Sequence, residues 1–325
     1  MLLVTGGAGY IGSHFVHEYL RQQKGSIIVV DDLSEGHEQA VADSGAKLVK
    51  CNIGDREAME QVFSENKIEA VVHFAASAYV GVSQEQPFKY FQNNVVQTLS
   101  LLELMEKHGI RKIVFSSTCA TYGTPTYVPI DEKHPQSPIN VYGSTKLMVE
   151  KALDALAIAK GWSFVALRYF NAAGAADDGS IGEHHDPETH LIPLVLQAAK
   201  GTIPHIQVNG SDYDTPDGTC IRDYIHVTDL ADAHIRALDL LHKEGVREFI
   251  NLGTEKGNSV KEVISVCAQV TGKDIPQKFG PRRPGDPASL VANATKAAQV
   301  LGWKPQRDLK NILETAWKWE QNPKY

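Results

Sequence analysis

The chain has 325 residues, of which 42% are hydrophobic and 22% charged, and its formal net charge is -7 at pH 7. These values are typical of a globular protein with a sizeable core, and the mild negative charge argues against a surface for nucleic acid or an anionic membrane. No apolar run reaches the length of a membrane span. The cysteines are widely separated and form no C-x-x-C pair, which favours reduced thiols in a cytoplasmic protein: Cys51, Cys119, Cys220 and Cys267.

Strands and helices are expected to alternate through the first half of the chain. Short apolar runs rich in β-branched residues predict strands at 2–4, 26–30, 47–50, 70–74, 112–115 and 164–167. Helix-like segments between them lie at 12–23, 55–66, 88–108 and 143–160. This alternation is typical of an α/β fold, in which helices cover both faces of a parallel sheet.

The rhythm changes after Phe170. Residues 172–187 are small, polar and rich in turn formers, and we interpret them as the entry to a second lobe. We expect a cofactor-binding domain over 1–170, to which the chain returns around 220–252. The remaining residues, 171–325, would form a smaller C-terminal α/β lobe that binds substrate.

Two of the predicted helices, 88–108 and 143–160, carry apolar residues on more than one side. In the first, Val95, Leu99 and Leu102 form one stripe, while another consists of Leu101, Leu104 and Met105. Such a helix is either enclosed within one chain or shared with a partner subunit. We expect the second arrangement, and therefore a homodimer.

The segment TGGAGYIGSH, which begins at Thr5, packs four glycines directly after the first predicted strand. It fits G-x-G-x-x-G through Gly7, Gly9 and Gly12, and equally fits T-G-x-x-G-x-x-G, which uses Gly6. Between a strand and a helix, this motif is typical of dinucleotide binding, with the pyrophosphate on the N–H groups at the helix start. The expected fold is therefore a Rossmann-type doubly wound parallel sheet.

Asp31 ends the second predicted strand, where this fold places an acid against the ribose hydroxyls of the adenosine. A carboxylate at that position repels a 2′-phosphate, and no Arg or Lys occurs from 32 to 46. The sequence therefore predicts NAD rather than NADP as the cofactor.

YGSTK places Tyr142 and Lys146 four residues apart, on one face of a predicted helix. Thr118 lies just past the strand at 112–115, where open α/β sheets carry their ligands. A Tyr/Lys pair alone is usually a solvated helix face, but its combination with an NAD motif favours catalysis. Lys146 and an oxidised nicotinamide would favour the phenolate form of Tyr142, which would act as base, while Thr118 would relay the substrate's hydroxyl proton.

Motifs of one pattern cover nearly the whole chain: TGGAGYIGSH, VVHFAA, FSSTCATYG, YGSTK, LRYFNAAGA, HLIPLV, RDYIHV and RRPGDP. With these motifs the chain resembles the extended short-chain dehydrogenase/reductase family, and several of them are specific to its nucleotide-sugar epimerases. The resemblance implies the cofactor-binding residues Gly6, Gly9, Tyr10, Ile11, Gly12, Asp31, Leu33, Gly36, Asn52, Ile53, Phe74, Ala75, Ala76, Asn93, Tyr142, Lys146 and Phe170. It implies the substrate-binding residues Thr118, Asn171, His190, Arg222, Arg283, Asp286 and Ser289.

The activity implied by the resemblance is epimerisation at C4 of a UDP-sugar, between UDP-galactose and UDP-glucose, with tightly bound NAD. Ser289 would leave room for an N-acetyl group, which implies that the N-acetylated UDP-sugars are substrates too. The alternatives are a 4,6-dehydratase or decarboxylase on the same scaffold, and a non-catalytic regulator that senses NAD. Cys119 and Ala120 follow Thr118 where dehydratases carry acids, which argues against dehydration, and the retained Tyr/Lys pair argues against the regulator.

One polar segment, GEHHDPETH at 182–190, could pass for a metal site through His184, His185, Asp186 and His190. Its spacing fits no familiar zinc pattern. From the sequence alone we expect a polar loop there, and no metal.

Overall fold

The computed structural model describes residues 1–283 and 285–325. The chain divides into two compact units, each built from separate stretches of sequence. The first unit comprises Met1–Gly123, Gln136–Arg168 and Ala231–Ile250, and the second comprises Thr124–Pro135, Tyr169–Leu230 and Asn251–Tyr325.

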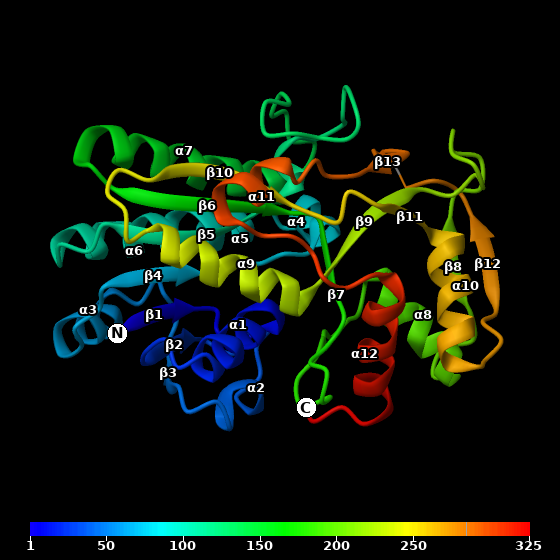
Figure 1. Cartoon of the computed structure of the whole chain (residues 1–325), viewed down its shortest axis with the longest axis horizontal. Coiled ribbons are helices and arrows are strands. Elements are labelled where there is room, and N and C mark those ends of the chain that lie inside the picture. Colours follow the sequence, from blue (N-terminus) through cyan, green and yellow to red (C-terminus); the bar gives the residue numbers. More distant parts are fainter. Residues whose placement is uncertain (284) are drawn as a thin grey trace. The chain divides into compact units, whose positions relative to one another are not determined.

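A seven-stranded sheet forms the centre of the first unit, with the strand order β10-β6-β5-β4-β1-β2-β3 (Figure 1). Its strands are β1 (Leu2–Thr5), β2 (Ile27–Asp31), β3 (Lys47–Lys50), β4 (Ala70–His73), β5 (Lys112–Thr118), β6 (Ser163–Tyr169) and β10 (Arg247–Leu252). Strand β1 pairs in parallel with both β2 and β4, and β4 pairs in parallel with β5. The order therefore reverses at β1, which is the point where doubly wound sheets bind their ligands. The predicted fold class is confirmed.

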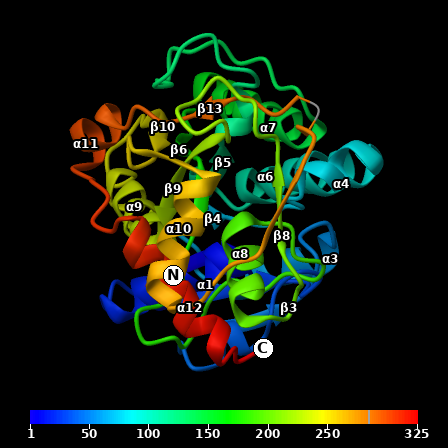
Figure 2. The same cartoon turned by 90° about the vertical axis from the view of Figure 1, so that its right-hand side faces the viewer.

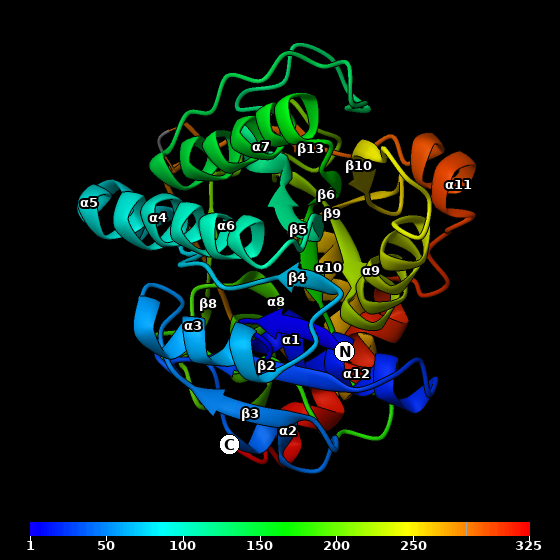
Figure 3. The same cartoon turned by 90° about the vertical axis from the view of Figure 1, so that its left-hand side faces the viewer.

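Helices cover this sheet on both faces. They are α1 (Tyr10–Arg21), α2 (Gln39–Ala42), α3 (Arg56–Glu65), α4 (Val80–Glu85), α5 (Pro87–Tyr90), α6 (Gln97–Lys107), α7 (Val141–Lys160) and α9 (Val227–Leu240). On one face, Met59 of α3, Leu101 of α6 and Val149 of α7 share one buried core with the strands. Figure 3 shows α6 and α7 side by side. On the other face, Phe15 of α1 contacts His234 of α9 edge to face.

The segment 88–108, expected as one helix, is instead divided by a π-helical turn over Phe91–Val96, between α5 and α6. Buried Asn94 lies in this turn, and its side chain makes hydrogen bonds to Ser77 and Thr145. Oδ1 accepts from the Ser77 N–H at 2.9 Å, and Nδ2 donates to the Ser77 carbonyl at 3.0 Å and to Thr145 Oγ1 at 3.1 Å. The wider turn satisfies a buried amide, which apolar periodicity does not reveal.

The second unit contains a four-stranded sheet and a separate strand pair. The sheet consists of β7 (Asn171–Ala173), β9 (Ile221–His226), β11 (Gly257–Ser259) and β13 (Ser289–Leu290), and the parallel pair consists of β8 (Ile206–Asn209) and β12 (Gln277–Gly280). Its helices are α8 (Leu191–Lys200), α10 (Val260–Thr271), α11 (Thr295–Leu301) and α12 (Leu309–Gln321). Helices α8, α10 and α12 pack together around Leu196, Val263 and Leu313 (Figure 2). Among the described residues, no helix is long and apolar enough to cross a membrane.

Candidate active site

The glycine-rich loop joins β1 to α1 through a turn that only glycine fits. Gly6 has a φ of +71°, and a Cβ there would lie 2.4 Å from the Ala75 nitrogen. A Cβ on Gly12 would lie 2.2 Å from the Gly6 carbonyl oxygen. A Cβ on Gly9, by contrast, would meet only the Gly6 oxygen, at an ordinary 3.5 Å. The structure itself therefore does not demand glycine at position 9, and its small size leaves space at the start of α1 for a ligand.

That helix start suits an anion. Gly9 is the N-cap of α1, and no described side chain caps the helix there. The first turn of any helix presents N–H groups that lack intrahelical acceptors, together with the positive end of the helix dipole. A pyrophosphate would supply the missing acceptors.

Asp31 lies at the carboxyl end of β2, beside this loop. Its Oδ2 accepts from the Ala8 N–H and its Oδ1 from the Leu33 N–H, both at 2.9 Å. Burial raises the pKa of Asp31, while these backbone donors oppose the shift. A Cβ on Gly36 would lie 3.0 Å from Asp31 Oδ1, so the glycine packs directly against the carboxylate. The geometry fits an acid fixed in place to accept from ribose hydroxyls.

The other expected cofactor residues of this unit follow the neighbouring strands. Asn52 donates from Nδ2 to Asp32 at 2.6 Å and accepts from the Gly54 N–H at 2.8 Å. Ile53 is buried beside it. After β4, the N–H groups of Phe74 and Ala75 bond the Thr5 carbonyl, at 2.9 and 3.1 Å, and Ala76 follows. Asn93, in the π-helical turn, reaches Ser77 Oγ at 3.3 Å. Their contacts with the cofactor stay a prediction.

Thr118, Tyr142 and Lys146 are all buried in the first unit. Thr118 ends β5, and its hydroxyl accepts from the Ala120 N–H at 3.1 Å. Tyr142 lies in the first turn of α7, which Asn140 caps by accepting from the Gly143 N–H at 2.7 Å. The Lys146 Nζ lies 5.8 Å from the centre of the Tyr142 ring and 5.0 Å from that of Phe115.

Lys146 is held at the end of β5 by a hydrogen bond from Nζ to the Ser116 carbonyl, at 2.8 Å. Burial lowers the pKa of Lys146 to about 7, and the Glu150 carboxylate opposes this shift. The amine therefore sits near its own titration at neutral pH, which is a common property of catalytic groups. A cation here stabilises a neighbouring phenolate.

A buried ion pair next to Lys146, which the sequence motifs do not reveal, supports this site. Glu150, one turn beyond Lys146 on α7, binds Arg168 of β6 through two bonds, at 2.9 and 2.7 Å. Ser117 of β5 also donates to Glu150, at 2.6 Å. The available signal was an arginine inside an otherwise apolar strand, since a buried charge needs a partner.

In the second unit, the structure brings together most of the residues expected to bind substrate. Arg222 of β9 bonds Asp286 through Nη2, and the Asp286 N–H donates to the Arg283 carbonyl at 3.2 Å. Ser289 of β13 pairs with Ile221 of β9 in register, next to Arg222. Arginines beside an aspartate suit a ligand that offers both phosphate and hydroxyl groups.

Asn171, His190 and Phe170 also belong to this unit. Asn171 of β7 pairs with Tyr224 of β9, two residues from Arg222. His190 caps the start of α8 and contacts Glu188 at 2.8 Å. Phe170 follows the last residue of β6 in the sequence and is buried, and it is the one expected cofactor residue that lies outside the first unit.

Comparisons with known proteins agree with this chemistry. Residues 2–253 match the model of the NAD dependent epimerase/dehydratase family. A UDP-glucose 4-epimerase of Halalkalibacterium halodurans is 50% identical over 321 residues, which cover 98% of this chain and 95% of that protein.

Solved structures agree as well. A UDP-glucose 4-epimerase from Bifidobacterium longum, in complex with NAD+ and UDP, is 42% identical with a TM-score of 0.94, over 99% of this chain and 98% of that one. The UDP-Glc/GlcNAc 4-epimerase of Campylobacter jejuni is 40% identical with a TM-score of 0.86, over 98% of both chains. The chain belongs to the NAD dependent epimerase/dehydratase family.

Proposed function

We propose that this chain interconverts UDP-galactose and UDP-glucose by inverting C4 of the sugar. The observation that carries the proposal is the buried Tyr142 and Lys146 on one face of α7, with Thr118 at the neighbouring end of β5. Both nucleotide sugars are UDP esters of hexoses that differ only at C4, so a transient oxidation there is sufficient.

The residues divide the chemistry among them. Thr118 hydrogen-bonds the sugar O4 hydroxyl, and Tyr142 takes its proton, while the Lys146 cation stabilises the phenolate. Bound NAD supplies the hydride acceptor and donor. Arg222 and Arg283 hold the diphosphate while the 4-keto sugar rotates and presents its opposite face to the cofactor. Tyr142 then returns the proton to O4.

The direct test is an NMR assay of purified protein with UDP-galactose. UDP-glucose should appear without any added reductant or oxidant. A dehydratase would instead release a 4-keto-6-deoxy sugar nucleotide, but the turn after Thr118 is Cys119–Thr121, which carries no carboxyl group to promote elimination. Absence of any turnover would favour the NAD-sensing regulator.

We expect the protein to purify with NAD already bound and to need little or none added. Each turnover oxidises and then reduces the same sugar, so NAD is regenerated on the enzyme and does not have to dissociate between turnovers. Denaturing the purified protein and quantifying the released nucleotide by chromatography checks this. A protein that purifies without NAD and produces NADH in proportion to product would be a net dehydrogenase.

Substrate breadth depends on Ser289, which is half-buried on β13 next to the Arg222 position of β9. We propose that this small side chain borders the sugar C2 substituent and leaves room for an N-acetyl group. The enzyme would then also interconvert UDP-N-acetylglucosamine and UDP-N-acetylgalactosamine, as the name of the Campylobacter jejuni relative suggests for that protein.

Ser289→Tyr is expected to suppress activity on the N-acetylated sugars by roughly tenfold or more, and to spare UDP-galactose. The tyrosine ring would take up the space that the N-acetyl group needs, and forcing extra atoms into a packed space costs about 1–3 kcal/mol. The kcat/KM values for both sugar pairs measure this, with Ser289→Ala as the control that keeps the space open. Wild-type protein that is active on UDP-galactose and inert on both N-acetylated sugars would contradict the proposal.

We also propose a cytoplasmic homodimer. All four cysteines are free, which suits a reducing compartment. Leu99 of α6 and Met148 of α7 are 40% and 45% exposed. Ile158 of α7 and Val96, which ends the π-helical turn before α6, are exposed as well. A second copy would cover this apolar surface.

Met148→Glu is expected to shift the protein from dimer to monomer, because a carboxylate in an apolar interface loses its hydration. Light scattering after gel filtration measures the mass. Phe279→Glu is the control, since Phe279 is equally exposed, at 47%, but lies on β12 of the second unit. A wild-type protein that is monomeric at assay concentrations would refute the dimer.

A further inference from the structure

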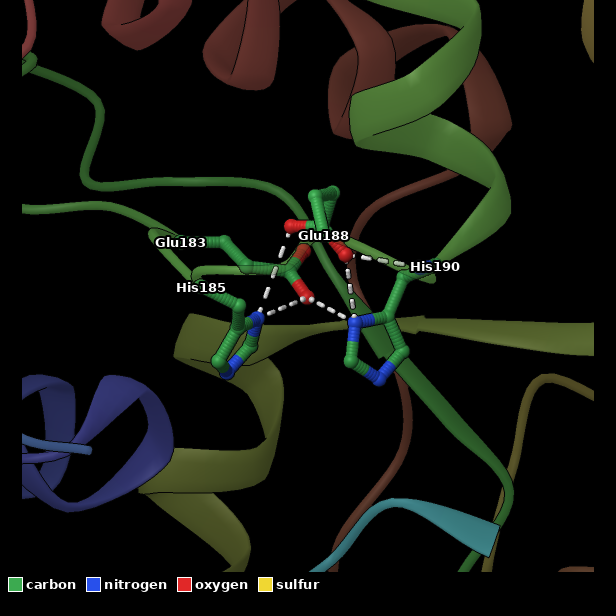
Figure 4. Close-up of side chains that lie close together, drawn as sticks. All are labelled: Glu183, His185, Glu188 and His190. Atoms are coloured by element: carbon green, nitrogen blue, oxygen red, sulfur yellow. Dashed lines mark hydrogen bonds and ion pairs between the residues drawn. The ribbon is translucent and has the colours of Figure 1, made fainter. Parts of the chain in front are cut away.

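Four side chains of the loop before α8 converge on one point, as Figure 4 shows. They are Glu183, His185, Glu188 and His190, and one ligand atom of each lies within 4.8 Å of all the others. The Nδ1 atoms of both histidines face the carboxylates. Neither His184 nor Asp186 takes part, and the two glutamates, which the sequence motif did not single out, complete the group.

These atoms lie close enough together to share one metal ion, since each of the four ligand atoms is within 4.8 Å of the others. His185 Nδ1 lies 3.4 Å from Glu183 Oε1 and 3.5 Å from Glu188 Oε2. His190 Nδ1 lies 3.2 Å from Glu183 Oε1 and 2.8 Å from Glu188 Oε1. Zinc bonds to imidazole and carboxylate of about 2.0–2.2 Å place neighbouring ligands of a tetrahedron roughly 3.3–3.6 Å apart. With one oxygen of each glutamate as ligand, shifts of these side chains by about an ångström would bring all four ligand atoms to that spacing around one ion.

The backbone of the loop is fixed at both ends of the cluster. Trp319 of α12 donates from Nε1 to the Glu183 carbonyl at 2.9 Å. At the other end, Glu188 Oε1 accepts from the N–H groups of Thr189 and His190, both at 2.7 Å. A group of ligands held this way needs little ordering when an ion binds, which favours affinity.

The charges of the group also balance a divalent cation. Burial lowers the pKa of His185, but its contacts with Glu183 and Glu188 outweigh this and raise the pKa to about 10. Burial likewise raises the pKa of Glu188, and the hydrogen bonds from both histidines lower it to about 2. Burial also lowers the pKa of His190, but its contacts with Glu188 and Glu183 outweigh this and raise it. The carboxyl groups of Glu183 and Glu188, once ionised, can offset the charge of one divalent ion.

We propose that Glu183, His185, Glu188 and His190 form a binding site for one Zn²⁺ ion. Two imidazoles and two carboxylates suit this borderline metal, and the full set of four protein ligands is typical of a structural site rather than a catalytic one. The ion would tie the loop to the start of α8. It would also leave Nε2 of His190 as a hydrogen-bond donor, because the metal occupies Nδ1.

Calorimetric titration of the NAD-loaded protein with Zn²⁺ tests the site directly and needs no activity assay. One equivalent should bind, and binding should release protons, which titrations in buffers of different ionisation enthalpy measure. Co²⁺ in place of Zn²⁺ should give the intense visible absorption of tetrahedral cobalt. His185→Gln and Glu183→Gln should each weaken binding by more than about tenfold.

His184→Gln is the matched control, because it removes the adjacent histidine, carries the same bound NAD and leaves the four ligands intact. It should bind Zn²⁺ as the unchanged protein does, and circular dichroism should show all variants folded. The proposal is overturned if the unchanged protein shows no saturable binding, or if His185→Gln binds as tightly as His184→Gln. In the first case, the ion pairs within the loop hold the cluster together without a metal.

Discussion

Tyr142→Phe is expected to lower the turnover of UDP-galactose by about 10²–10⁴-fold, the usual contribution of a positioned acid–base group. The change removes one oxygen from a buried side chain and keeps the ring that packs beside Lys146. Only the proton acceptor for the sugar O4 is lost, so the fold and the bound NAD should remain. NMR assays at saturating substrate measure the turnover, and chromatography of the denatured protein measures the NAD.

The matched control is Tyr127→Phe. Tyr127 is an exposed residue of the second unit whose hydroxyl donates to Asp131 at 2.7 Å, so the variant also removes one phenolic oxygen, but from a side chain outside the set predicted to be catalytic. Its turnover should equal that of the unchanged enzyme. Near-normal turnover of Tyr142→Phe would show that another group is the base. Loss of NAD from Tyr142→Phe would show that the residue acts mainly in cofactor binding.

The inner strands β1, β2, β4, β5 and β6 were predictable because almost every residue in them is buried. Continuous apolar runs such as IIVVD of β2 remain visible without any tertiary information. The short strands of the second unit were not predictable: β13 has two residues and β7 has three, and both pair with β9 from distant parts of the sequence. Strands of this length carry no periodicity of their own, so only the folded chain defines them.

The candidate site divides in the same way. Gly6 and Gly12 were predictable as part of a motif, because steric limits leave only glycine at these positions. Asp31, Tyr142 and Lys146 were predictable from their spacing in the sequence. Side chains that only position other residues were not predictable. Asn94 orders the π-helical turn through hydrogen bonds to Ser77 and Thr145, residues that lie far away in the sequence. Such partners come together only after folding.

Arg168 and Glu150 form the clearest example of this hidden support, because both side chains are nearly inaccessible, at 4% and 1% exposure. Besides its two bonds to Glu150, Arg168 donates to the Tyr122 hydroxyl at 3.0 Å and lies 4.7 Å from the centre of the Phe249 ring. Gln136 donates to the same carboxylate at 3.0 Å. The pair connects α7, which carries Tyr142 and Lys146, to β6.

Glu150→Gln is expected to lower the free energy of unfolding by about 3–5 kcal/mol, because it leaves the Arg168 guanidinium buried without a counter-charge. It should also reduce turnover, since the carboxylate raises the pKa of Lys146 and its loss favours the neutral amine at pH 7. Urea denaturation of protein with matched NAD content measures the first effect, and the NMR assay measures the second.

The control for this prediction is Glu103→Gln. It breaks an exposed ion pair between Glu103 and Arg56, whose length of 2.7 Å equals that of the shorter bond between Glu150 and Arg168. Exposed pairs contribute about 0–1 kcal/mol, so this variant should unfold almost as the unchanged protein does. Replacing both buried partners, as Glu150→Met with Arg168→Met, should recover most of the stability lost in Glu150→Gln, because no unpaired charge remains. If Glu150→Gln is no less stable than Glu103→Gln, the guanidinium finds other acceptors or water, and the pair does not support α7.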